Sequence, residues 1–265
     1  MAATNCSTVG APAAPSGVEY TRRVNPPLLG VIYRQFRAGS DDASRGRRGP
    51  SVFDVVDHIP DSGERVGHWE RVYEHHRADS VSWYQTEPVV SLELVDLLGV
   101  SAEAGVIDVG GGASVLVDAL LHRGFAHLTV LDISEAALQA SRERVGADAP
   151  VEWIAHDLLT WEPTRRYHLW HDRAVFHFLS GDEVGVYRDL LHRAVAPRGY
   201  VVMATFAPDG PEWCSGLPVT RYGADQLIEA LGAEFMLVDE RREVHATPSG
   251  ATQPFTWIAA RRVGN

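Results

Sequence analysis

Three aspartates each follow an apolar segment of the chain, and together they could form one binding site. Asp108 closes VIDV, Asp132 closes LTVLD, and Asp157 follows VEWIAH. Apolar segments of this kind are typical of strands in a parallel sheet, whose carboxyl ends converge on one crevice. Carboxylates gathered there would attract a cation, and Asp132 could also accept the hydroxyl protons of a ribose. Capping of the next helix is the alternative role for Asp132 and Asp157.

Three glycines follow Asp108 and fit a cationic ligand better than a phosphate. Gly110 and Gly112 match the first two positions of the G-x-G-x-x-G dinucleotide fingerprint, but Val115 occupies the third. A diphosphate would face the carboxylate of Asp108, and the loop has no lysine to hold it. The three aspartates instead match a ligand that carries a sulfonium, an ammonium, a ribose and an adenine. That ligand is S-adenosylmethionine.

A second polar group lies in LWHDRAVFHFL, where His171, Asp172, Arg173 and His177 are the candidate catalytic residues. Either histidine could act as a general base, because an imidazole titrates near neutral pH. Arg173 could attract an anionic acceptor or pair with Asp172. Methyl transfer depends mainly on holding donor and acceptor in line, so a base is needed only if the acceptor arrives protonated. A packed or solvated role is the alternative for each histidine.

The elements that must position these residues alternate between strands and helices. Strands are expected at 105–109, 127–132, 151–155, 167–172 and 199–206, and helices at 67–76, within 82–99, and at 113–123, 134–145, 182–195 and 223–231. This alternation predicts a parallel sheet with helices on both faces. The turn signal TPSG near the C-terminal end predicts a closing antiparallel hairpin. The expected fold class is therefore α/β, with a Rossmann-like, seven-stranded and mostly parallel sheet.

Composition narrows the class of protein further. The net charge of −11 argues against a nucleic-acid partner, and no apolar run is long enough to cross a membrane. No secretory signal is visible, so a cytoplasmic location is expected. The chain has no lysine, which excludes Schiff-base chemistry. Its two cysteines and scattered histidines lack the spacing of metal ligands, so no metal is predicted.

The N-terminal part differs from the rest of the chain in composition. Residues 1–17 are predicted to be disordered, and 39–50 reads as a flexible linker. The segment 26–37 mixes apolar and basic residues and is interpreted as covering the main domain, with a docking helix as the alternative. We therefore predict an N-terminal extension at 1–64 and one catalytic domain at 65–265.

The segments VIDVGGGASVLVDALL, LTVLDIS, WIAHDLL and LWHDRAVFHFL resemble successive motifs of the class I S-adenosylmethionine-dependent methyltransferases. The resemblance covers about residues 65–262. It implies that Asp108 and the glycines approach the methionine part of the donor, Asp132 the ribose, and Asp157 with Leu158 the adenine. The full predicted cofactor-binding set is Trp69, Tyr73, Trp83, Asp108, Gly110, Gly111, Gly112, Ser114, Asp132, Ile133, Asp157, Leu158 and His171.

The LWHDR segment is similar to the WDR segment of thiopurine-type methyltransferases, with His171 as an insertion. That subgroup acts on small, polarisable nucleophiles, and its N-terminal segment tends to cover the site. The aromatic residues Trp69, Tyr73, Trp83 and Tyr84 are accordingly predicted to form a lid that excludes water, with a hydrophobic staple as the alternative.

These observations predict an enzyme that transfers a methyl group from S-adenosylmethionine to a small-molecule nucleophile, a thiol or another chalcogen being the favoured class. The alternatives are an O- or N-methyltransferase of a larger metabolite and a non-catalytic donor-binding module. A nicotinamide oxidoreductase is disfavoured by Asp108 and by the missing third glycine. For Cys214, in the long loop 205–222, a packing role is favoured over a reactive thiol.

Overall fold

The structure is a computed structural model that describes residues 62–264 of the 265-residue chain. Three N-terminal predictions lie outside the described residues. They are the disorder of 1–17, the covering segment 26–37 and the linker 39–50. The first described helix begins at Ser62, so the division of the chain near residue 65 stays a prediction.

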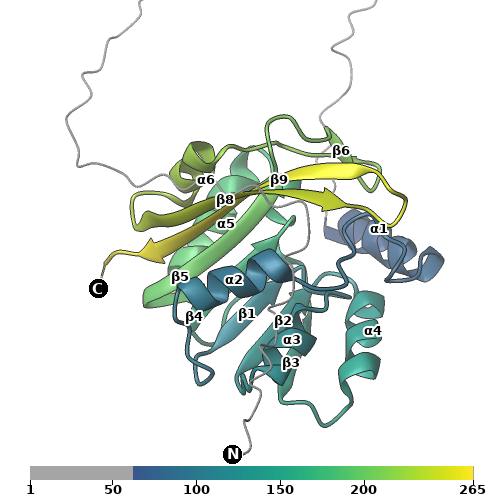
Figure 1. Cartoon of the computed structure of the whole chain (residues 1–265), viewed down its shortest axis with the longest axis horizontal. Coiled ribbons are helices and arrows are strands. Elements are labelled where there is room, and N and C mark those ends of the chain that lie inside the picture. Colours follow the sequence, from purple (N-terminus) through teal and green to yellow (C-terminus); the bar gives the residue numbers. More distant parts are fainter. Residues whose placement is uncertain (1–61, 265) are drawn as a thin grey trace, which may run out of the picture.

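A seven-stranded sheet forms the centre of the molecule, in the order β3-β2-β1-β4-β5-β9-β8 (Figure 1). The strands are β1 (Val106–Val109), β2 (Leu128–Asp132), β3 (Val151–Ala155), β4 (Tyr167–Arg173), β5 (Val195–Phe206), β8 (Phe235–Ala246) and β9 (Thr252–Arg262). The first five are parallel, whereas β9 is antiparallel to both β5 and β8. The predicted fold class and the closing hairpin are confirmed. The second strand of the hairpin, rather than the first, pairs with β5.

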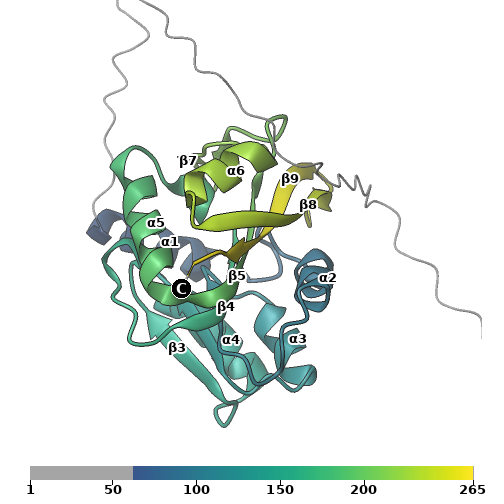
Figure 2. The same ribbon diagram turned by 90° about the vertical axis from the view of Figure 1, so that its left-hand side faces the viewer.

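Helices cover both faces of this sheet. They are α1 (Ser62–His75), α2 (Val89–Leu97), α3 (Leu116–His122), α4 (Glu135–Val145), α5 (Asp182–Ala194) and α6 (Ala224–Leu231). One apolar cluster joins the sheet to α5 and α6, and a second joins it to α2, α3 and α4. Figure 2 shows α5 and α6 on one side of the sheet, with α2 and α3 on the other. No helix among residues 62–264 has the length and apolar character that crossing a membrane requires.

The helix expected at the end of the stretch 82–99 is α2, which begins after Pro88, a residue that lacks an N–H and disfavours a helical residue before it. Residues 205–222, expected as a loop, contain a short ribbon of β6 (Trp213–Cys214) and β7 (Leu217–Pro218). Short 3-10 turns, η1 (Leu158–Thr160) and η2 (Phe176–Phe178), follow β3 and β4.

Helix α1 is fastened to the domain beside α4 (Figure 1). One carboxylate oxygen of Glu70 accepts from the backbone N–H of Glu135 at 2.7 Å, and the other accepts from the hydroxyl of Ser134 at 3.1 Å. An acidic side chain at a helix N-terminus satisfies free N–H groups and complements the helix dipole. The N-terminal end of α4 is therefore capped from another helix.

Candidate active site

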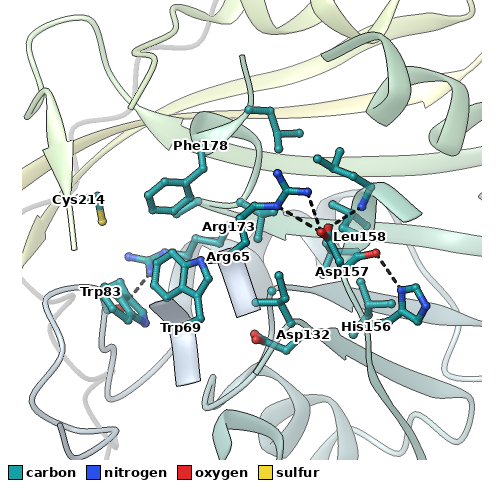
Figure 3. Close-up of a pocket in the computed structure, with 18 of the residues that line it drawn as sticks. Arg65, Trp69, Trp83, Asp132, His156, Asp157, Leu158, Arg173, Phe178 and Cys214 are labelled. Carbon is teal, nitrogen blue, oxygen red and sulfur yellow. Dashed lines mark hydrogen bonds and ion pairs between the residues drawn. The ribbon is translucent and has the colours of Figure 1, made fainter. Parts of the chain in front are cut away.

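A cavity opens at the carboxyl ends of the parallel strands (Figure 3). A second, smaller cavity shares several of its lining residues. Of the predicted cofactor-binding residues, the larger cavity is lined by Trp69, Tyr73, Trp83, Gly110, Asp132, Ile133, Asp157 and Leu158, and the smaller by Tyr73, Trp83, Asp108, Gly110, Gly111, Ser114 and His171. The two adjoining cavities thus bring together residues that are more than 100 positions apart in sequence.

The glycine loop is required by the carboxylates packed against it. Gly110 has a φ of +65°, in the left-handed region that favours glycine. A β-carbon at Gly111 would lie 2.5 Å from Oδ2 of Asp108, and one at Gly112 would lie 2.6 Å from Oδ2 of Asp132. Gly112 lines neither cavity, contrary to its predicted contact with the donor. Its role is to let the chain pass close to Asp132.

Asp132 is held by backbone groups at the end of β2. Its Oδ2 accepts from the N–H of Gly112 and its Oδ1 from the N–H of Ser134, both at 2.9 Å. Burial raises the pKa of Asp132 to about 6, and the negative charges of Asp108 and Glu70 add to the effect, while the two backbone hydrogen bonds oppose it. A ligand that donates hydrogen bonds to this carboxylate would favour its ionised form.

Asp108 belongs to a buried chain of three side chains. Its Oδ1 lies 2.7 Å from Nδ1 of His171, and Nε2 of that ring lies 2.9 Å from the hydroxyl of Ser91. The other oxygen of Asp108 is buried and has no hydrogen-bond partner among the described residues. Ser91 was not among the predicted site residues, since nothing in its local sequence marks it.

Asp157 is engaged by a residue that the sequence did not indicate. Its Oδ2 accepts from Nη2 of Arg65 at 2.8 Å (Figure 3). The same guanidinium reaches Glu183 at 3.1 Å. Burial alone would raise the pKa of Asp157, but the hydrogen bonds from Arg65, Ser62 and the backbone of Leu159 outweigh it and lower the pKa. Helix α1 is therefore tied to the cavity rim at the predicted adenine position.

Aromatic side chains close the cavity on the side of α1. The ring of Trp69 lies 5.8 Å from that of Trp83 and 5.2 Å from that of Phe178, in edge-to-face arrangements (Figure 3). The indole N–H of Trp83 donates to the hydroxyl of Tyr73 at 3.3 Å. Tyr84 lines only the smaller cavity. The contacts fit both predicted roles, because the same rings border the cavity and pack α1 against the domain.

Arg173 lies where the two cavities meet and has unused hydrogen-bonding capacity. Its Nη1 donates to the carbonyl of Trp83 at 2.9 Å, and its guanidinium carbon lies 4.7 Å from the centre of the Phe255 ring. Nε and Nη2 are buried with no hydrogen-bond partner in the part of the chain that the structure describes. Cys214 also lines the larger cavity, and burial raises the pKa of its thiol to about 12, against the opposing charge of Arg173. This thiol is therefore neutral at physiological pH.

Two predicted catalytic residues need correction, because Asp172 and His177 line neither cavity. Side chains alternate along a strand, so Asp172 points away from the face shared by its neighbours and accepts from the hydroxyl of Tyr187 at 2.7 Å. It is not paired with Arg173. His177 is buried, its ring accepts from the N–H of Phe206 at 3.4 Å, and burial, with the nearby positive charge of Arg173, lowers its pKa to about 3.

Comparison with known proteins assigns the class of this fold. A model of the methyltransferase domain matches residues 106–199. Malonyl-[acyl-carrier protein] O-methyltransferase 2 of Ilyobacter polytropus is 21% identical over 132 residues, which cover 48% of this chain and 50% of that protein. The match thus spans about half the length of that curated relative.

Solved structures share the fold at low sequence identity. One is the 1,6-didemethyltoxoflavin-N1-methyltransferase of Burkholderia thailandensis with bound 1,6-didemethyltoxoflavin and S-adenosylhomocysteine, at 22% identity, 77% of this chain, 87% of that chain and a TM-score of 0.58. Another was solved in work on the conversion of a disulfide bond into a thioacetal group during echinomycin biosynthesis. It is 22% identical over 76% of this chain and 94% of that chain, with a TM-score of 0.60.

Residues 106–199 therefore resemble a methyltransferase domain, and the chain shares the fold of a methyltransferase solved with bound S-adenosylhomocysteine. The comparisons single out no subgroup of methyltransferases, so the resemblance to the thiopurine-type enzymes stays a prediction. Among residues 62–264, no group of three or more histidine, cysteine or acidic side chains could hold a metal ion.

Proposed function

We propose that this protein transfers a methyl group from S-adenosylmethionine to a small-molecule nucleophile that is held beside the donor. The observation that carries the proposal is the pair of carboxylates, Asp108 and Asp132, packed against glycines whose β-carbons would collide with them. Oδ2 of Asp108 is buried and has no hydrogen-bond partner among the described residues, so it would be stabilised by a cationic hydrogen-bond donor. Asp132 suits ribose hydroxyls, and the rim at Asp157 and Leu158 suits an adenine.

The residues present fit this donor. Bound there, S-adenosylmethionine supplies a methyl group that its sulfonium has already activated for displacement. The protein's contribution is then to orient the two reactants and to exclude water. Trp69, Trp83 and Phe178 form the apolar wall that would keep water from the reacting atoms.

We assign the methyl acceptor to the part of the larger cavity beside Arg173. This part favours a nucleophile that is already an anion when it binds. Arg173 offers two free N–H positions there, among the apolar rings of Phe206 and Phe255. His177 lies outside the cavity and has a lowered pKa, so it is a poor general base. An ionised thiol or another chalcogen anion needs no base, because its lone pair attacks the methyl carbon and no proton has to leave.

Calorimetry with S-adenosylhomocysteine and turnover with a matched series of benzenethiol, phenol and aniline test this proposal. We expect calorimetry to detect binding of S-adenosylhomocysteine. Among the three nucleophiles, we expect methyl transfer to be fastest with benzenethiol. Faster transfer to aniline would refute the anionic acceptor and favour an N-methyltransferase. Tight binding without transfer to any nucleophile would favour the non-catalytic module. Absence of binding would refute the proposed function as a whole.

A further inference from the structure

The chain of Ser91, His171 and Asp108 lies under the smaller cavity, and methyl transfer as proposed above uses only its last member. The three side chains come from three different elements, α2, β4 and β1, and none is more than 4% exposed. Asp108 and His171 are direct partners across the parallel pair of β1 and β4. Their side chains therefore lie on the same face of the sheet, which explains the short contact between them.

The contacts make the two oxygens of Asp108 unequal. Oδ1 is bonded to His171, whereas Oδ2 is buried without a partner among the described residues. Oδ2 lies beside Gly111, where a β-carbon would come within 2.5 Å of it, and both residues line the smaller cavity. The bond to His171 fixes the plane of the carboxylate, and this plane directs the free oxygen toward the glycine loop.

Ser91 and Asp108 hold the imidazole of His171 from its two nitrogens. Nδ1 lies 2.7 Å from Oδ1 of Asp108, and because a carboxylate oxygen accepts, Nδ1 is the donor of this bond. Nε2 lies 2.9 Å from the hydroxyl of Ser91, which can accept or donate and so serves as the partner of this nitrogen. With both nitrogens bonded, the ring has a fixed orientation and in turn holds the carboxylate of Asp108.

We infer that His171, held by Ser91, is a positioning residue that fixes Asp108 to receive the cationic amino group of the donor's amino-acid end. This inference rests on the proposed function, because it assumes that the donor lies in these cavities. It differs from the predicted role of His171 as a base or a direct donor contact, since both ring nitrogens are already engaged.

Two ligands and two substitutions at one position test the inference. S-adenosylhomocysteine carries the amino-acid end, whereas 5′-methylthioadenosine lacks it. In His171→Asn, the amide nitrogen stands near the position of Nδ1 and can still donate to Asp108. In His171→Gln, the amide nitrogen extends toward the position of Nε2 and Ser91 instead. The pair therefore separates the bond to Asp108 from the bond to Ser91 at nearly constant polarity.

We expect His171→Gln to weaken S-adenosylhomocysteine binding about 10- to 100-fold, the effect of losing a hydrogen bond to a charged group. Binding of 5′-methylthioadenosine should be unchanged. His171→Asn should stay within a few-fold of the wild type for both ligands. Ser91→Ala should weaken S-adenosylhomocysteine alone, and by less than His171→Gln. His168→Gln, at an exposed position of the same strand, is the matched control and should change neither affinity.

General damage to the fold would weaken both ligands alike. It would therefore leave unchanged the ratio of the dissociation constants for S-adenosylhomocysteine and 5′-methylthioadenosine. Equal weakening of both ligands by His171→Gln would overturn the inference, as would unchanged binding of both. If that variant does not fold, Ser91→Ala decides by the same ratio. If the wild-type protein methylates an acceptor but the ratio is the same in these variants, only this inference is overturned. Wild-type protein that binds neither ligand would refute the proposed function as well.

Discussion

The raised pKa of Asp132 predicts that donor affinity and stability both depend on pH. The folded protein holds this carboxyl at a pKa of about 6, against an ordinary value of 3.8. Proton uptake therefore stabilises the ligand-free fold as the pH falls through 6, and this contribution is lost as the pH rises above it. The perturbation that isolates it is Asp132→Asn, which removes the titrating group and keeps its size.

The magnitude follows from the two pKa values. Between pH 7 and pH 5, proton uptake by Asp132 should raise the unfolding free energy of the wild type relative to the variant by about 1 kcal/mol. Asp172 also has a pKa raised to about 6, chiefly by burial, but both proteins carry it, so it cancels from the difference. Urea denaturation of both proteins at several pH values measures this difference.

The same proton must leave when ribose hydroxyls bind to ionised Asp132. Wild-type affinity for S-adenosylhomocysteine should therefore be about tenfold weaker at pH 5 than at pH 7, whereas Asp132→Asn should show a weaker but pH-independent affinity. Calorimetry at the two pH values checks both statements. Parallel pH profiles for wild type and variant, in stability and in affinity, would show that Asp132 does not titrate in this range, and the reasoning would fail.

Three further substitutions test other contacts. Gly111→Ala places a β-carbon 2.5 Å from the carboxylate of Asp108, so we expect at least about tenfold weaker S-adenosylhomocysteine binding by calorimetry, and unchanged affinity would contradict the glycine argument. Arg173→Gln should raise KM for benzenethiol about tenfold without changing donor affinity, and the reverse result would assign Arg173 to the donor. Glu70→Ala should lower the unfolding free energy by about 1 kcal/mol in urea denaturation through loss of the cap on α4, with exposed Glu74→Ala as the neutral control.

The sheet could be predicted from the sequence because its central strands β1 and β2 are short, mainly apolar segments. VIDV and LTVLD are buried along their whole length, so their ends, and the carboxylates of Asp108 and Asp132, could be located without coordinates. Pro88 also carried a usable signal for the start of α2, the helix expected at the end of the stretch 82–99. The order of β8 and β9 could not be predicted, since either strand of a hairpin can pair with β5.

The errors in the candidate site come from treating neighbours in sequence as neighbours in space. His171 and Arg173 share one face of β4 and Asp172 lies on the other, as the period of two along a strand requires. The alternation along β4 could therefore have been used on the sequence to separate Asp172 from His171 and Arg173. The contact of Arg65 with Asp157 joins residues 92 positions apart and has no local signature. Ser91 is equally unmarked, since it becomes relevant only when α2 packs over β4.

The position of β9 between β5 and β8 makes the last strand along the chain an interior one. During synthesis, β1 to β5 emerge first, and until β9 follows, β5 presents an open edge to other strands. Phe255 of β9 also forms part of the cavity wall at Arg173, so a nascent or trimmed chain that lacks it would lose one side of the proposed acceptor site. Trimming at this end therefore removes an interior strand together with one side of the cavity, whereas β8 forms the outer edge of the sheet.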